Sequence, residues 1–186
     1  MKLRIRYIFL LIIVSTTFNS LISQDNIDSI LYWDNCNVLT WDLFNGEPWD
    51  STDFGAASYI GIDVETSFQS GLPYLSIRTS FSPIVSWKKI PSDPLLIHEQ
   101  GHFDLAEVYS RRIRKEVDQL RNSNNTNFDS YFNIYDSLYS TYRQESGKYD
   151  FETDYGKNLE IQGTWNRKLK LQLHELNMYK FKILLE

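Results

Sequence analysis

The sequence predicts an α+β fold, in which a small antiparallel sheet is followed by a long helix and two further packed helices. Residues 60–68 and 75–81 alternate between apolar and more polar side chains, which is the two-residue period of half-buried strands. Residues 93–121, 128–142 and 159–176 instead repeat apolar side chains every three or four positions, as amphipathic helices do.

The two strands are expected to pair as an antiparallel hairpin with one face on the core. A turn cluster at Gly71-Leu72-Pro73 separates them. Upstream, residues 39–44 form an aromatic and β-branched segment that stops at the turn cluster 45–48. Residues 25–33 are expected to form a short helix or arm, and residues 84–87 lead toward the long helix.

The long helix is expected to begin at Asp93-Pro94, an N-cap residue followed by proline at the first helical position, and to extend to about Arg121. Its apolar stripe consists of Ala106, Tyr109, Ile113, Val117 and Leu120. The second helix carries an aromatic seam and is expected to weaken or end at Gly147. The third helix covers Leu159 to Leu176.

The first 24 residues have the layout of a secretory signal peptide. Three basic side chains within the first six residues precede an apolar run, 7–14, and then a small, polar stretch. Polar residues from Ser15 onward keep this run well short of the ~20 apolar residues that span a bilayer. We therefore expect residues 1–24 to be cleaved, residues 25–186 to form one domain, and no stable membrane insertion afterwards.

The charge balance argues against a nucleic-acid partner. Without residues 1–24 the chain changes from 19 basic and 24 acidic residues to 16 and 24, a net charge of −8. An acidic domain without a basic stripe binds nucleic acid poorly. The basic cluster on the long helix is expected to form a solvated face, with Glu107 pairing with Arg111. Its members are Arg111, Arg112, Arg114 and Lys115. Because residues 1–24 resemble a signal peptide, we expect an exported protein, periplasmic or extracellular.

The segment His98-Glu99-Gln100-Gly101-His102 lies near the start of the long helix. Residues four apart share one helix face, so both imidazoles can bind one metal ion while Glu99 contacts a water molecule on that ion. This H-E-x-x-H pattern is typical of a zinc site with a general base. A pair of surface histidines is the alternative. However, the apolar stripe that follows turns the histidines toward the protein body, where buried imidazoles need a partner.

A catalytic zinc ion normally takes three protein ligands and one water molecule. The third histidine that some zinc helices carry six residues after the second is Val108 in this chain. Glu107 lies about 180° around the helix from His98, so it points the wrong way. His174 is expected at the surface. The third ligand is therefore expected from the acidic stretch 149–156.

Much of the chain resembles a bacterial family of predicted secreted zinc-dependent proteases, otherwise a domain of unknown function. The similar segments are residues 39–46 (LTWDLFNG), 96–104 (LIHEQGHFD) and 149–153 (YDFET), followed by Gln162 and Trp165-Asn166. The resemblance implies an exported, zincin-like hydrolase with His98 and His102 as zinc ligands and Glu99 as the general base. By analogy with zincins, residues 75–81 are the candidate edge strand for an extended substrate.

The chain departs from the family pattern at one position. The family continues as E-T-x-H-G, whereas this chain has Glu152-Thr153-Asp154-Tyr155-Gly156, with tyrosine in place of histidine. We expect Glu152 to be the third zinc ligand and Tyr155 to hydrogen-bond the developing oxyanion. If the missing histidine is the family's third ligand, the chain binds zinc weakly or is a degenerate member. Glu152 as a solvated acid near a helix end is the structural alternative.

The predicted function is that of a secreted zinc metallopeptidase, which hydrolyses bonds in peptide or protein substrates with zinc as its cofactor. Two alternatives stay open. One is a catalytically degenerate exported binding protein on the same scaffold, and the other is a zinc amidase acting on cell-wall peptides. No sequence feature indicates an oligomeric state.

Overall fold

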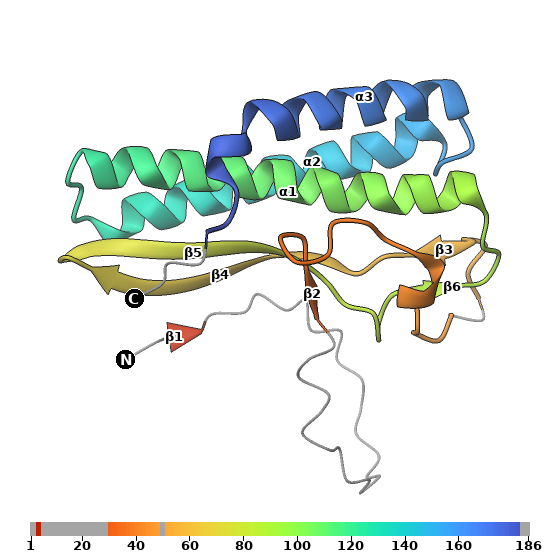
Figure 1. Cartoon of the computed structure of the whole chain (residues 1–186), viewed down its shortest axis with the longest axis horizontal. Coiled ribbons are helices and arrows are strands. Elements are labelled where there is room, and N and C mark those ends of the chain that lie inside the picture. The colour runs from red at the N-terminus through yellow and green to blue at the C-terminus, as the bar shows by residue number, and fades with distance from the viewer. Residues whose placement is uncertain (1–2, 5–29, 49–50, 183–186) are drawn as a thin grey trace, which may run out of the picture.

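The structure, a computed structural model, describes residues 3–4, 30–48 and 51–182. It confirms the predicted α+β fold, because antiparallel strands come first and three helices pack together on one side of them (Figure 1). Apart from residues 3–4, the expected signal peptide lies outside the described residues. Within the described ranges, every helix falls short of the length or apolar composition that crossing a bilayer requires.

The larger sheet is built on one long hairpin. β4 (Ile60–Gln69) and β5 (Leu72–Phe81) pair antiparallel in continuous register over their whole length. Ser70 and Gly71 form the turn with φ angles of 53° and 78°, and positive φ angles at both positions suit the right-handed twist of a two-residue hairpin. Pro73 therefore lies inside β5 and not in the turn where the sequence placed it.

Short strands extend this sheet on both sides. β1 (Leu3–Arg4) pairs with β4, and β2 (Leu31–Tyr32) pairs with the end of β5, which gives the strand order β1-β4-β5-β2. The helix or arm expected over residues 25–33 is thus a short strand at residues 31–32, while residues 25–29 lie outside the described ranges.

A second, two-stranded sheet lies near the start of the long helix α1 (Asp93–Asn122), as Figure 1 shows. β3 (Ala56–Ala57) pairs antiparallel with β6 (Trp87–Lys88), and Gly46 forms a bridge to Trp87. This small sheet positions the segment that precedes β4 over the first turns of α1.

Two polar residues of the H-E-Q-x-H-F-D pattern attach the N-terminal segment to α1. Gln100 accepts a hydrogen bond from the backbone N–H of Leu39 at 2.8 Å and donates to Asp104 at 2.8 Å. Asp104 also accepts from the indole N–H of Trp33 at 3.0 Å. Burial raises the pKa of Asp104, although these two hydrogen bonds oppose the effect. Gln100 and Asp104 thus have a structural role beside the histidines.

The helices follow the predicted order with one difference in length. α1 has Ser92 as its N-cap, so the predicted cap Asp93 is instead the first helical residue, and Pro94 lies in the first turn, where a missing N–H costs nothing. α2 (Phe128–Thr153) continues straight through Gly147, so the predicted end at Gly147 is wrong. One glycine in a helix costs only about 1 kcal/mol relative to alanine, which tertiary packing readily outweighs. α3 (Leu159–Glu175) and the short η3 (Asn177–Tyr179) complete the fold.

The core lies between α1, the hairpin and the other two helices. The predicted apolar stripe of α1 is confirmed, because Ala106, Tyr109, Ile113 and Val117 are buried and Leu120 packs against them. Since α1 contacts both β5 and the other two helices, most of its surface is enclosed. The histidines near its start therefore face the protein interior.

The basic cluster on α1 differs from its prediction. Arg111 and Arg114 are buried and not solvated, because both bind the buried carboxylate of Glu107. The predicted Glu107–Arg111 pair is confirmed at 2.8 Å. The two guanidinium groups also donate to the carbonyl oxygens of Leu173 and Tyr179, so they fasten the C-terminal part of the chain to α1.

Candidate metal centre

Helix α1 presents two imidazoles to the interior, one turn apart. His98 is 3% exposed, and the side chain of His102 is 15% exposed. Their Nε2 atoms lie 3.2 Å apart. The four-residue spacing on a straight helix is what brings these two atoms together, so this part of the site is local in origin.

Helix α2 supplies the third member of the cluster. Asp150 Oδ1 lies 2.8 Å from Nε2 of His102 and 3.2 Å from Nε2 of His98, although 48 residues separate Asp150 from His102. Among the described residues, these three form the one group of histidine, cysteine and acidic side chains close enough together to bind one metal ion. The site is therefore made by the packing of α2 against α1.

Gln162 of α3 determines which nitrogen of His98 carries hydrogen. The Tyr149 hydroxyl donates its only hydrogen to the carbonyl oxygen of His98 at 3.0 Å, so it can only accept from the amide Nε2 of Gln162. Gln162 therefore turns its oxygen toward His98 Nδ1, at 3.2 Å. An amide oxygen accepts, so Nδ1 carries the hydrogen and Nε2 presents a lone pair to the cluster.

A similar contact supports His102. Ser146 lies one turn before Asp150 on α2, and its Oγ is 3.2 Å from Nδ1 of His102. A hydroxyl can accept a hydrogen bond from Nδ1, which leaves the lone pair on Nε2. Hydrogen-bond partners of this kind orient metal-binding imidazoles and fix their tautomers.

The carboxylate of Asp150 is held in its charged form. Burial opposes its ionisation, but protonated imidazoles at His102 and then at His98, which donate to the carboxylate and carry positive charge, outweigh burial and lower the pKa of Asp150 below its ordinary value. A metal cation would take the place of those Nε2 protons, because the two imidazole lone pairs and the carboxylate oxygen would then all face the cation.

The donor set fits a zinc ion in both chemistry and spacing. Imidazole nitrogen and carboxylate oxygen are ordinary zinc ligands. Two ligands bound about 2.0–2.1 Å from a tetrahedral zinc ion lie about 3.3 Å apart. The three separations in the structure, 2.8, 3.2 and 3.2 Å, are close to that value.

Two glycines allow the close packing around His98. A methyl group at Gly101 would overlap the hydroxyl oxygen of Tyr149, which must lie there to reach the carbonyl oxygen of His98. A Cβ atom at Gly156 would lie 2.8 Å from the Cβ atom of His98, and the φ angle of Gly156 is +81°. Both positions therefore require glycine for steric reasons.

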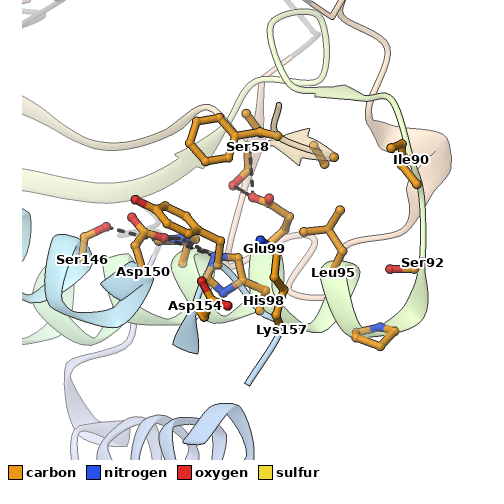
Figure 2. A pocket seen from close by; sticks show the side chains of 18 of the residues that line it. Ser58, Ile90, Ser92, Leu95, His98, Glu99, Ser146, Asp150, Asp154 and Lys157 are labelled. Atoms are coloured by element: carbon orange, nitrogen blue, oxygen red, sulfur yellow. Dashed lines mark hydrogen bonds and ion pairs between the residues drawn. The ribbon is translucent and has the colours of Figure 1, made fainter. Parts of the chain in front are cut away.

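Glu99 lies beside the cluster in a cleft of about 900 Å³. It is 4% exposed, and its Oε2 accepts hydrogen bonds from the backbone N–H of Ser58 at 3.0 Å and from the Ser58 hydroxyl. Figure 2 shows Glu99 reaching toward Ser58, with His98 and Asp150 to one side. A buried carboxylate that accepts hydrogen bonds from Ser58 thus lies next to the candidate metal site.

The strand that flanks this cleft is β3 and not β5. Ala56, Ala57 and Ser58 line the cleft, whereas β5 contributes no residue to it. Residues 75–81, the predicted substrate strand, are thus absent from the cleft, and β2 pairs with β5 only at Ser80 and Phe81. β3 pairs with β6 along one edge, and among the described strands nothing pairs with its other edge.

The structure does not bring Glu152 to the histidines. Residues two apart on a helix point about 200° away from each other, so Glu152 and Asp150 lie on opposite faces of α2. The carboxylate of Glu152 accepts from the indole N–H of Trp165 at 2.9 Å and lies 3.6 Å from the ammonium group of Lys148. In this acidic stretch the carboxylate that lies close to both imidazoles is thus that of Asp150, two residues before the predicted ligand Glu152.

Tyr155 does reach the cleft, on the loop between α2 and α3. Three successive residues, Asp154, Tyr155 and Gly156, have φ angles of 47°, 52° and 81°. Such left-handed backbone is costly for side chains other than glycine, and it turns the chain sharply over the cleft. Tyr155 is 45% exposed, and its ring lies against that of Phe54 with 5.2 Å between centroids.

Comparisons with known proteins give no match, whether to family models, curated proteins or solved structures. The resemblance to secreted zinc-dependent proteases therefore stays a prediction. The structure supports a more general conclusion, namely that His98, His102 and Asp150 form a possible metal site.

Three residues of the site were not singled out from the sequence: Asp150, Ser146 and Ser58. Extending α2 beyond Gly147 would have placed Ser146 and Asp150 one turn apart on the same helix face. No sequence signal connects Ser58 with Glu99, because their contact depends on the position of β3. His174 is exposed, as expected.

Proposed function

We propose that this protein is a zinc-dependent hydrolase of peptide bonds, with His98, His102 and Asp150 as its zinc ligands. The observation that carries the proposal is the convergence of these three donor atoms within 3.2 Å of one another. Glu99 adds to it, since a buried carboxylate next to a metal site is the arrangement that a general base requires.

A bound zinc ion would polarise the substrate carbonyl and lower the pKa of a water molecule toward 7. In the proposed reaction Glu99 takes a proton from the attacking water as the new C–O bond forms. Glu99 then delivers that proton to the amide nitrogen as the C–N bond breaks, so the products are a carboxylic acid and an amine. The Ser58 contacts orient the carboxylate of Glu99 for both transfers.

Tyr155 and β3 have supporting roles in this proposal. The phenol of Tyr155, at the cleft, donates a hydrogen bond to the oxyanion that develops on the carbonyl oxygen. An extended substrate adds to the unpaired edge of β3, whose backbone N–H and C=O groups align the scissile bond with the metal site. Export, with cleavage after about residue 24, remains part of the proposal.

The test compares wild-type protein with Glu99→Gln. We expect the wild type to bind one zinc ion per chain, measured by plasma emission spectrometry after gel filtration, and to cleave peptides from a broad library. Glu99→Gln should keep the zinc ion and lose activity by about 10²- to 10⁴-fold, the usual contribution of a general base. A wild type that takes up no metal from excess zinc, or a fully active Glu99→Gln variant, would overturn the proposal.

The same library separates the alternative functions. Zinc binding without turnover on any peptide, combined with retained peptide affinity, would identify a binding protein on this scaffold. Turnover restricted to cell-wall peptides would identify an amidase, since the metal chemistry is common to both enzymes.

A further inference from the structure

One wall of the cleft is apolar next to the candidate metal site. Leu95 lies three and four residues before His98 and Glu99 on α1, so it shares their helix face. Ile90, which precedes α1, and Leu159, the first residue of α3, line the same cleft. This wall therefore begins within one helical turn of the proposed ligands.

Two aromatic rings continue this apolar wall. Phe54 and Tyr155 come from two different loops, and their rings are in contact, with 5.2 Å between centroids. Gly55, next to Phe54, packs directly on Leu95, because a Cβ atom at Gly55 would lie 2.8 Å from the Leu95 Cδ2 atom. The loop before β3 thus forms a cover over the leucine.

The side chains of this wall are unusually exposed for their type. Phe54 is 50% exposed, Ile90 67% and Leu159 60%. Large apolar side chains that gather in one concavity, and do not lie scattered over a convex surface, are typical of a binding site for apolar groups. Covering them with an apolar group would be favourable because it removes this surface from water.

The charged groups around the cleft do not offer an alternative specificity. Asp53, Asp154 and Lys157 line it and are exposed, and they carry charges of both signs. Exposed charges in contact with solvent contribute little binding energy.

We propose that Phe54, Ile90, Leu95, Tyr155 and Leu159 form a specificity subsite for one bulky apolar side chain of the substrate, next to the scissile bond. This inference rests on the proposed peptidase function and specifies its substrate class, namely peptides with leucine, isoleucine, methionine or phenylalanine at one position beside the cleaved bond. The subsite lies against the metal site because Leu95 is one turn from His98.

The chain offers a matched pair of variants for the test. Leu159 and Leu171 lie on the same helix and are 60% and 57% exposed, but only Leu159 lines the cleft. Cleavage sites in a degenerate peptide library, identified by mass spectrometry, should be enriched in bulky apolar residues at one position. For two peptides that differ there by leucine or serine, Leu159→Ser should reduce the ratio of kcat/KM values by roughly tenfold or more. Leu171→Ser should leave that ratio unchanged.

A binding measurement separates failure of the subsite from failure of the enzyme proposal. Glu99→Gln protein is titrated, with and without zinc, into fluorescently labelled forms of the same two peptides, and affinity is read from fluorescence polarisation. Preferential binding of the leucine peptide, lost on adding Leu159→Ser and kept on adding Leu171→Ser, supports the subsite even if no peptide is cleaved. Equal affinity for both peptides, or measurable affinity for neither, overturns it, as does cleavage without apolar preference.

Discussion

The ring of Tyr149 stacks on the imidazole of His98, with 4.7 Å between centroids and 14° between planes, while its hydroxyl donates to the His98 carbonyl oxygen at 3.0 Å. One side chain of α2 therefore holds both the ring and the backbone of a proposed zinc ligand on α1. The same hydroxyl accepts from Gln162, so it also fixes the tautomer of His98.

Replacement of Gln162 by leucine should weaken zinc binding without removing a ligand. The variant loses the amide oxygen that accepts from His98 Nδ1 and leaves the more distant Thr153 hydroxyl, at 3.4 Å, beside that nitrogen, so the tautomer of the imidazole is less firmly fixed. We expect a loss of zinc affinity of roughly 10- to 100-fold, measured by competition with a chromophoric chelator. Gln172→Leu on the same helix is the control, since the Gln172 oxygen has no hydrogen-bond partner among the residues that the structure describes. Equal affinities for the two variants would contradict the role of Gln162.

Replacement of Asp150 by asparagine should have a larger effect on zinc affinity than replacement of Glu152 by glutamine. Asp150→Asn removes an anionic donor from between the imidazoles, whereas Glu152 contacts Trp165 and Lys148. We expect Asp150→Asn to lose more than about 100-fold in zinc affinity, because direct ligands contribute more than their hydrogen-bond partners do. The same chelator competition applies. If Glu152→Gln loses zinc and Asp150→Asn keeps it, the third ligand is Glu152.

The substitution Gly101→Ala should destabilise the protein, although alanine favours helices more than glycine does. Its methyl group would overlap the Tyr149 hydroxyl oxygen, and we expect a cost of roughly 1–3 kcal/mol from overpacking. Gly147→Ala is the matched control in α2, where a Cβ atom meets nothing within 4 Å. That change should stabilise the protein by up to about 1 kcal/mol. Free energies of unfolding in urea, measured in the presence of EDTA, test the predicted loss for Gly101→Ala and the predicted gain for Gly147→Ala. A Gly101→Ala variant that is more stable than the wild type would contradict the close contact between Gly101 and Tyr149.

The substitution Glu107→Gln should be among the most destabilising polar changes in the chain. Glu107 is 3% exposed and binds both Arg111 and Arg114, so neutralising it leaves two buried guanidinium groups without their anion. We expect a loss of about 3–5 kcal/mol in the free energy of unfolding in urea. Lys148→Ala, which breaks the exposed contact with Glu152, should change it by less than about 1 kcal/mol. Similar losses of unfolding free energy in both variants would show that Glu107, Arg111 and Arg114 are solvated and not buried.

The sequence alone determined the helix that carries the two imidazoles of the candidate metal site. His98, Glu99 and His102 lie within five residues, and the geometry of one helix turn fixes their relative positions whatever surrounds them. The long hairpin and the order of the three helices were equally accessible, because hydrophobic periodicity records which face of each element is buried.

Only the tertiary structure decided which carboxylate lies beside the imidazoles, which strand lies beside the cleft, and that two arginines are buried. Asp150 and Glu152 are both acidic and two residues apart, and the packing of α2 on α1 selects Asp150 for the histidines. In the same way, Arg111 and Arg114 are buried because β5 and the C-terminal segment cover that face of α1. These outcomes depend on contacts between segments far apart in the chain, which local spacing does not encode.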